Sequence, residues 1–256
     1  MSAGWSAVLL FAFVAGSAGL LGVWLMVRHE PWARAHTAEL ITFASGILVA
    51  GSLLYLLPEA SRMVGAVGAM SWTLGAFVAL YVAENHFLPH PHTRDDHPEH
   101  SGNTGIAGNT GMAVILGLAL HSILDGVAVG AGFSTSLVTG GVIVSLVVAH
   151  KLPVGIASMG AMYHSGEPAA RAVRYSVFVA MLTPLAVIAS YVLMRSASER
   201  TLGAVVAAAG GSFLYVGAAD LLPEGQATGL RRNTLIFLIG VGIVVAIRVL
   251  GVEPAG

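Results

Sequence analysis

The sequence predicts an all-α integral membrane protein with eight transmembrane helices. Of its 256 residues, 56% are hydrophobic and only 10% are charged, and the mean hydropathy is +0.81. An ordinary soluble domain carries about 25% charged residues. The few charges lie between apolar runs that are close to the roughly 20 residues needed to cross a bilayer. Composition and charge spacing therefore place the chain among multi-pass membrane proteins.

Eight apolar runs are the expected spans, and we treat residues 1–256 as a single transmembrane domain. They cover residues 4–27, 37–57, 70–88, 111–133, 137–162, 170–195, 201–222 and 233–250. No Lys or Arg precedes the first run, whereas a signal peptide usually begins with a basic region. We therefore expect a retained first span, with a cleaved signal as the alternative.

The arginines between the spans predict the orientation of the chain. If the N-terminus is outside, the cytoplasmic segments hold Arg28, Arg34, Arg94, Arg171, Arg174, Arg231 and Arg232. The outer segments hold Arg62, Arg195, Arg200 and Arg248. Because positive residues concentrate on the cytoplasmic side, both termini are expected outside, in the cell membrane.

An internal repeat relates the second and seventh spans. Residues 56–60 read Leu-Leu-Pro-Glu-Ala and residues 221–225 read Leu-Leu-Pro-Glu-Gly, an offset of 165 residues. The two spans cross in opposite directions, so spans 1–3 and 6–8 would form an inverted repeat around spans 4 and 5. Inverted repeats with a mid-membrane site are typical of transporters. Coincidence among Gly, Ala and Leu is the alternative.

The one long polar segment, residues 89–110, separates the third and fourth spans. It has no apolar periodicity, so we expect a flexible cytoplasmic loop. Its histidines are His90, His92, His97 and His100. Such tracts can bind metals, so weak metal binding is expected here, with a solvated linker as the alternative.

Two polar motifs lie near the centres of the fourth and fifth spans. Residues 121–126 read His-Ser-Ile-Leu-Asp-Gly, and residues 150–155 read His-Lys-Leu-Pro-Val-Gly. His121 and Asp125 are four residues apart and share one face of a helix. With His150 from the next span they form three ligands, a common open zinc geometry. Ionisable groups inside a membrane are costly and mark functional sites, so we expect a metal site used for transport.

Lys151 and Ser122 are the expected neighbours of this metal site. A lysine at mid-membrane depth needs an anion, and Asp125 is the nearest expected partner. We therefore interpret Lys151 as a fixed cation beside a single metal ion; a structural Asp–Lys pair without metal is the alternative. Pro153 removes one intrahelical hydrogen bond within a turn of His150.

Other classes of function are less favoured. The net charge of −1 indicates no nucleic-acid partner, and the absence of cysteine excludes thiolate ligands. An intramembrane zinc hydrolase could use the same three ligands and an activated water. However, the His-Glu-x-x-His motif that would supply its general base is absent. A scaffold or receptor that only retains a ligand is the third possibility.

These motifs resemble those of the ZIP (Zrt/Irt-like) divalent-metal transporters over essentially the whole chain. That family has eight spans, a His-rich cytoplasmic loop, and typical motifs His-Asn-x-Pro-Glu-Gly in span 4 and His-Glu-x-Pro-Glu-Gly in span 5. The resemblance assigns metal-ligand positions to His121, Asp125 and His150. Several positions depart from the pattern: Ser122 replaces Asn, Leu124 replaces Pro, and Lys151 and Val154 replace acids, while Asp125 is a shorter carboxylate at the acidic position of span 4. The departures resemble a branch with His-Lys in span 5 and argue against a two-metal centre.

The resemblance also implies an activity and partners. It implies import of zinc into the cytosol, and variably of manganese, iron or cadmium, as transported substrates without a resident cofactor. It implies a homodimer in the bilayer and movement of a unit that contains spans 4 and 5. The sequence does not rank the metals or identify the driving force.

Overall fold

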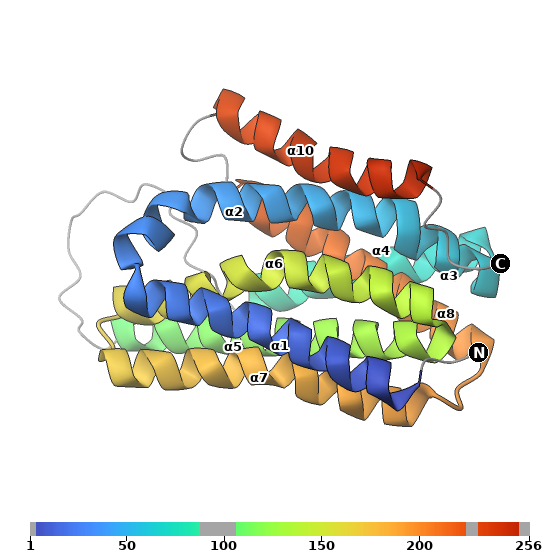
Figure 1. The fold of residues 1–256 in the computed structure, drawn as a ribbon, viewed down its shortest axis with the longest axis horizontal. Coiled ribbons are helices and arrows are strands. Elements are labelled where there is room, and N and C mark those ends of the chain that lie inside the picture. Colours follow the sequence, from blue (N-terminus) through green and yellow to red (C-terminus); the bar gives the residue numbers. More distant parts are fainter. Residues whose placement is uncertain (1–3, 88–105, 224–229, 251–256) are drawn as a thin grey trace.

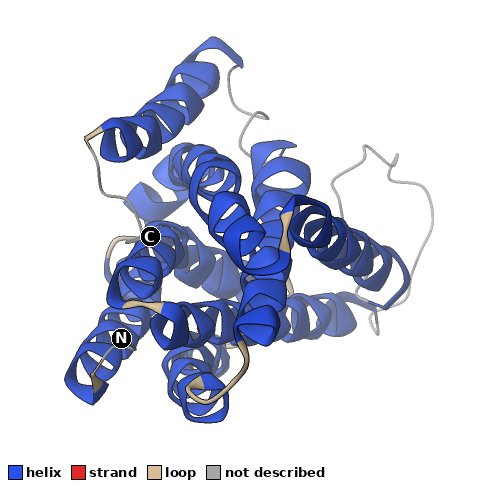
Figure 2. Cartoon of the chain, turned by 90° about the vertical axis from the view of Figure 1, so that its right-hand side faces the viewer, coloured by secondary structure: helices blue, strands red, loops and turns tan. Residues whose placement is uncertain are grey.

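The computed structural model describes residues 4–87, 106–223 and 230–250, and every regular element among them is a helix (Figure 2). The elements are α1 (Trp5–Arg28), α2 (Glu30–Gly51), the π-helix η1 (Ser52–Leu56), α3 (Leu57–Val64), α4 (Ala66–Phe87), α5 (Ile106–Thr135), α6 (Leu137–His164), α7 (Ala169–Met194), α8 (Glu199–Tyr215), the π-helix η2 (Val216–Leu221) and α10 (Leu230–Val249). Within the described residues, eight helices are long and apolar enough to cross a membrane, so the predicted fold class is confirmed.

Two predicted boundaries were wrong. The second span runs from Glu30 to Val64, because η1 and α3 continue α2 beyond the predicted end at residue 57. Pro58 lies in the first turn of α3, directly after the π-helix η1. The helix of the fourth span, α5, begins at Ile106, so residues 106–110, predicted as loop, belong to α5, although the part apolar enough to cross a membrane is Val114–Thr135. The loop histidines lie in 88–105, outside the described residues, and the predicted flexibility stays a prediction.

The helices pack as two groups that meet along α6. In one group α5 packs against α7 and α1 packs against α6, while in the other α10 packs on α2 and α4 on α8 (Figure 1). The groups meet where α2 contacts α6 and α8 contacts α5. The start of α1 and the end of α10 lie at the same end of the bundle, which also carries the turn between α5 and α6. We call this the α5–α6 end and the opposite one the α4–α5 end.

Glycine permits the closest helix contacts in the first group. A Cβ at Gly126 on α5 would lie 2.6 Å from the carbonyl oxygen of Thr183 on α7, so only a residue without a side chain fits. Two hydroxyl groups of α7 add hydrogen bonds across the same contact: Thr183 Oγ1 donates to the carbonyl of Ser122 at 3.1 Å, and Ser190 Oγ donates to that of Gly126 at 3.1 Å. The interface therefore holds α5 firmly against α7.

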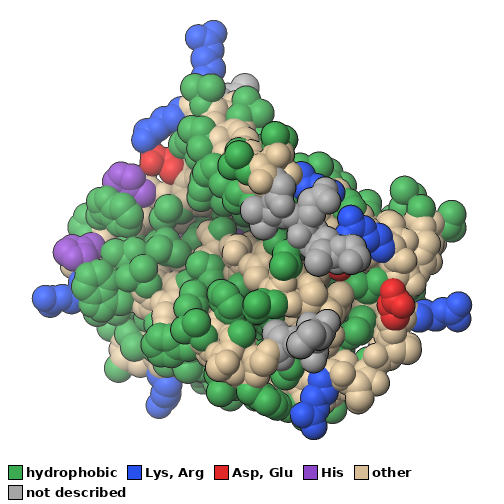
Figure 3. All heavy atoms as spheres, turned by 45° about the vertical axis from the view of Figure 1, so that its right-hand side comes forward, with side chains coloured by type: hydrophobic (Ala, Val, Ile, Leu, Met, Phe, Trp, Pro, Cys, Tyr) green, Lys and Arg blue, Asp and Glu red, His purple; other side chains and the backbone are tan. Residues whose placement is uncertain are grey.

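The apolar surface is consistent with a bilayer environment. Large hydrophobic side chains are exposed along α1, α4, α7 and α10. Figure 3 shows hydrophobic side chains over most of the visible face, with many of the Lys and Arg side chains projecting from its edges. Exposed apolar surface on this scale is costly in water and favourable in lipid.

Candidate metal site

Three ligand-type side chains converge between α5 and α6. His121 Nε2 and Asp125 Oδ2, one turn apart on α5, are 3.3 Å from each other. His150 Nε2 on α6 lies 3.2 Å from His121 Nε2 and 3.1 Å from Asp125 Oδ2. One ligand atom from each residue lies within 4.8 Å of the other two. The structure therefore brings the three predicted ligands together near the middle of two spans; we call them the triad.

A backbone hydrogen bond orients His150. Its Nδ1 lies 2.9 Å from the carbonyl oxygen of Leu146, and since a carbonyl only accepts, Nδ1 carries the proton and donates it. Nε2 then presents its lone pair toward Asp125 and His121. Histidines that bind metals commonly donate their other ring N–H in this way. α6 continues through Pro153, which cannot donate to the carbonyl of Ala149.

The predicted neighbours Lys151 and Ser122 both lie beside the triad. Lys151 Nζ is 2.7 Å from Asp125 Oδ2 and donates a 3.0 Å hydrogen bond to Ser122 Oγ. The side chains of Lys151 and Asp125 are each only 1% exposed. Each of these two buried groups therefore has the other as its nearest partner of opposite type, and removing either one would leave its partner buried without compensation.

One oxygen of Asp125 has no hydrogen-bond partner in the structure. Oδ1 is buried and receives no donor, whereas Oδ2 faces Lys151 and both histidines. Buried carboxylate oxygens are almost always paired, so an unpaired one indicates a ligand-binding position. Two imidazoles and a carboxylate suit zinc and other divalent transition metals.

The site opens toward one end of the bundle. His121 is 13% exposed, whereas Asp125 and His150 are at most 1% exposed. A cavity of about 90 Å³ extends from His121 toward the α4–α5 end. Its lining is Leu80, Ala83, Gly117, Leu118, Leu120, His121, Val154, Tyr215, Val216, Asp220 and Leu221.

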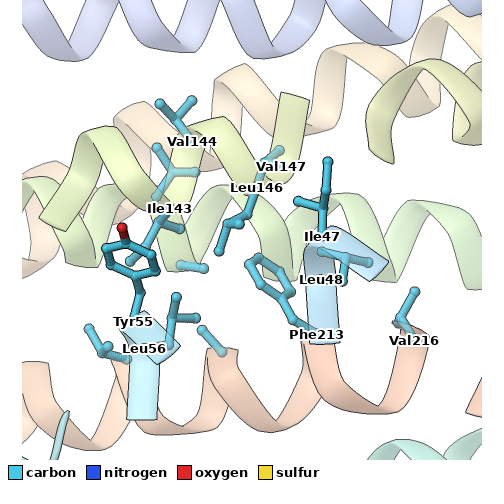
Figure 4. Close-up of a cluster of buried hydrophobic side chains, with 14 of the residues drawn as sticks. Ile47, Leu48, Tyr55, Leu56, Ile143, Val144, Leu146, Val147, Phe213 and Val216 are labelled. Carbon is cyan, nitrogen blue, oxygen red and sulfur yellow. The ribbon is translucent and has the colours of Figure 1, made fainter. Parts of the chain in front are cut away.

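An apolar plug closes the opposite side. Ile143, Leu146 and Val147 of α6 pack against Leu48 of α2 and Phe213 of α8, and all are nearly or fully buried (Figure 4). The Phe213 ring lies 5.8 Å from the His150 ring, edge to face, and so covers the triad directly. The sequence analysis did not identify Phe213, because an apolar residue in an apolar span carries no signal of its own.

A second buried carboxylate lies at the α5–α6 end. Glu59, on α3, accepts a 3.0 Å hydrogen bond from Thr139 Oγ1 on α6 and lies 3.3 Å from Arg62 Nη1. Thr139 in turn contacts Ser136, the N-cap residue of α6. Glu59 thus links the two helix groups on the closed side of the triad.

Comparison with known proteins identifies the family. A family model described as ZIP zinc transporter matches residues 86–248, which contain both polar motifs. The chain belongs to this family. It is therefore a multi-pass membrane protein of the ZIP type, and the predicted resemblance is confirmed; the placement in a His-Lys branch stays a prediction.

Curated ZIP relatives cover parts of the chain. Zinc transporter ZIP10 of Homo sapiens is 36% identical over 146 residues, which are 55% of this chain and 17% of ZIP10. Zinc transporter ZIP9-B of Xenopus laevis is 30% identical over 189 residues, 66% of this chain and 60% of ZIP9-B. Zinc transporter ZIP6 of Pongo abelii is 32% identical over 136 residues. The matches thus span less than a fifth of ZIP10 and ZIP6 and about three fifths of ZIP9-B.

Proposed function

We propose that this ZIP-family chain transports divalent transition-metal ions, zinc foremost, into the cytosol through the triad. The observation that carries the proposal is the convergence of His121, Asp125 and His150 at mid-span depth, within 4.8 Å and beside a cavity open to one end. The names of ZIP10 and ZIP9-B, which assign zinc to those proteins, support the choice of metal. Manganese, iron and cadmium are secondary substrates, since imidazole with carboxylate accommodates them.

Lys151 makes the site a one-ion site. Its ammonium is held 2.7 Å from Asp125 Oδ2, so a second divalent cation on that side of the carboxylate would meet a fixed positive charge. The unpaired Asp125 Oδ1 is on the same carboxylate and is available to the transported ion. The transported ion therefore binds Asp125 while Lys151 stays in contact with the same carboxylate, and the ion does not displace Lys151.

The transport movement is a shift of the group α1, α5, α6 and α7 against the other helices. Gly126 and the hydroxyl bonds of α7 make that group one packed unit, and the triad lies on its surface toward α8. In this structure the cavity is on the α4–α5 side and the plug is on the α5–α6 side. Such an arrangement corresponds to the state that exposes the site to one side of the membrane only.

Two hydrogen bonds, one from α2 to η2 and one from η1 to α8, support the proposed inverted repeat. Ser45 Oγ donates to the carbonyl of Gly217 at 2.6 Å, and Ser52 Oγ donates to that of Gly210 at 2.5 Å. Adding the offset of 165 residues takes position 45 to 210 and position 52 to 217. The repeat therefore relates the residue pair Ser45–Gly217 to the pair Ser52–Gly210. The π-helices η1 and η2 also fall at equivalent positions.

The two ends of the pathway follow the same relation. Tyr55 and Leu56 line a pocket of about 10 Å³ at the α5–α6 end, and their repeat equivalents Asp220 and Leu221 line the cavity of about 90 Å³ at the other. The small pocket is thus the position that the repeat relates to the cavity, and its smaller volume corresponds to the closed half of the path. This correspondence supports alternating access between two related half-paths.

Three further features belong to the proposal. The excess of arginine at the α4–α5 end supports a cytoplasmic location of that end, with both termini outside, in the cell membrane. The histidines His90, His92, His97 and His100 bind metal weakly near the exit. A homodimer is the proposed assembly, as the family resemblance implies.

The hydrolase alternative receives no support from the described residues. Among them, the triad is the one group of three metal-type ligands, and its single carboxylate is already held by Lys151. A zinc hydrolase needs a further base to activate the water.

Zinc uptake into proteoliposomes tests the proposed function. Wild type should accumulate zinc, and His121→Ala should not, since it removes one of three ligands while breaking no ion pair. Unlabelled manganese, iron and cadmium as competitors rank the substrates. Equal uptake by wild type and His121→Ala, or none by folded wild type, would refute the proposal.

A further inference from the structure

Two buried hydroxyl groups of α7 lie directly behind the metal ligands of α5. The two helices run side by side (Figure 1). Thr183 Oγ1 and Ser190 Oγ each donate a 3.1 Å hydrogen bond to a backbone carbonyl of α5, those of Ser122 and Gly126 respectively. A helical carbonyl already accepts one bond from the N–H four residues further on, and its second lone pair accepts these additional bonds. Each accepting residue directly follows a member of the triad in the chain.

The two bonds fix the rotation and the axial position of α5. Each residue of an α-helix advances about 100° around the axis and about 1.5 Å along it. The accepting carbonyls are four residues apart and face α7, so His121 and Asp125 lie about 100° further round, toward α6. Because His150 is on α6, a rotation or slide of α5 would change its distances of 3.2 Å to His121 and 3.1 Å to Asp125. Metal ligands tolerate displacements of only a few tenths of an ångström.

Ser122 extends the same contact to the buried lysine. Its carbonyl accepts the bond from Thr183 on α7, and its Oγ accepts the 3.0 Å bond from Lys151 on α6. Ser122 and Thr183 are fully buried, so water does not replace either bond. Since Lys151 Nζ also lies 2.7 Å from Asp125 Oδ2, a shift of Ser122 would move the ammonium relative to the carboxylate.

We propose that Thr183 and Ser190 are positioning residues of the metal site, whose hydrogen bonds hold His121 and Asp125 at coordinating distance from His150. The inference rests on the proposed function and extends it. α5 and α7 belong to the group that moves as one unit in the proposed transport cycle, so these bonds persist in every state of the cycle. They therefore set the affinity for the ion and leave the maximal transport rate nearly unchanged.

Zinc affinity, measured in detergent by competition with a chelating dye, tests the positioning role. All proteins carry Ser in place of the four loop histidines, so that weak loop binding does not obscure the result. The double variant Thr183→Val, Ser190→Ala should bind zinc about tenfold more weakly, the lower end of the loss found when groups that orient metal ligands are removed. The zinc concentration for half-maximal uptake into proteoliposomes should rise equally, while the maximal rate stays close to that of the background protein. The single variant Thr183→Val should show part of this loss, and Thr183→Ser, which keeps the hydroxyl, almost none.

Cobalt binding and a matched serine separate positioning from stability. The visible absorption of bound Co²⁺ depends on its coordination geometry, so the double variant should show altered bands. Ser176→Ala is the control, because Ser176 is a buried residue of the same helix whose Oγ has no hydrogen-bond partner among the described residues. It should bind zinc and Co²⁺ as the background protein does.

Melting temperatures in detergent with a chelator confirm that each variant is folded at the assay temperature. A double variant that melts lower but keeps the zinc affinity and the Co²⁺ spectrum of the background protein would overturn the positioning role, because its bonds would then only stabilise the fold. An equal loss of affinity in Ser176→Ala would also overturn it. Uptake that depends on His121 together with an unchanged double variant would refute this inference and leave the proposed function intact. No uptake by the folded background protein would refute both.

Discussion

The buried pair between Asp125 and Lys151 should determine stability as well as transport. Lys151 Nζ and Asp125 Oδ2 are 2.7 Å apart, and both side chains are 1% exposed. Removing one partner of such a pair leaves a buried charge and costs about 3–5 kcal/mol. Each kcal/mol lowers the melting temperature of a chain of this size by roughly 2–4 °C, so Asp125→Asn or Lys151→Met should melt roughly 6–20 °C below wild type.

Melting in detergent with a chelator present measures this effect without a contribution from bound metal. The double variant Asp125→Asn, Lys151→Met should melt well above either single variant, because replacing a whole buried pair is often nearly neutral. His121→Ala is the control, since it removes no ion pair and should melt close to wild type. Single variants within about 2 °C of wild type, or a double variant with merely additive losses, would refute the reasoning.

Three further perturbations test the packing and the closed side. Gly126→Ala places a Cβ 2.6 Å from the carbonyl oxygen of Thr183 and should destabilise the protein by about 1–3 kcal/mol in thermal melts. The control Gly160→Ala, with nothing within 4 Å of the added Cβ, should be neutral or stabilising. Equal melting temperatures of the two variants would contradict the tight α5–α7 contact. Thr139→Val removes the hydrogen bond to Glu59 and should expose the closed side more often. Because the chain contains no cysteine, a single Ile143→Cys substitution can be labelled with a membrane-impermeant thiol reagent, in the presence and absence of Thr139→Val. If Thr139→Val does not accelerate this labelling, the Thr139–Glu59 hydrogen bond does not hold the closed side shut. Phe213→Ala should increase labelling of the same cysteine by opening the plug over His150, and unchanged labelling would show that the plug does not depend on this ring.

Much of the fold could be predicted because membrane helices follow from local composition. Lipid offers no hydrogen bonds, so a long apolar run must satisfy its backbone internally as a helix. That reasoning located all eight spans, but it ended the second one at residue 57, whereas the helix runs on to Val64. Pro58 instead continues the helix after a π-turn, a feature that depends on contacts with α8 such as the Ser52–Gly210 hydrogen bond.

The triad was predictable for a similar reason. Polar residues inside an apolar span are rare, so His121, Asp125 and His150 were recognisable, and their depth in neighbouring spans indicated a shared site. The partner of Lys151 was also expected, because a buried ammonium requires an anion. Phe213 was not predictable, since nothing distinguishes it from other apolar residues until α8 packs against α6.

The sequence by itself determined the number of spans, the residue types at the centre of the chain and the family motifs, since each depends on residues close together in sequence. Only the tertiary structure decided which side of the triad is closed and which is open. That difference depends on how α2 and α8 pack against α5 and α6, and side chains from distant spans form both the plug and the cavity. Packing between distant segments depends on shape and volume along the whole interface, which no local pattern records.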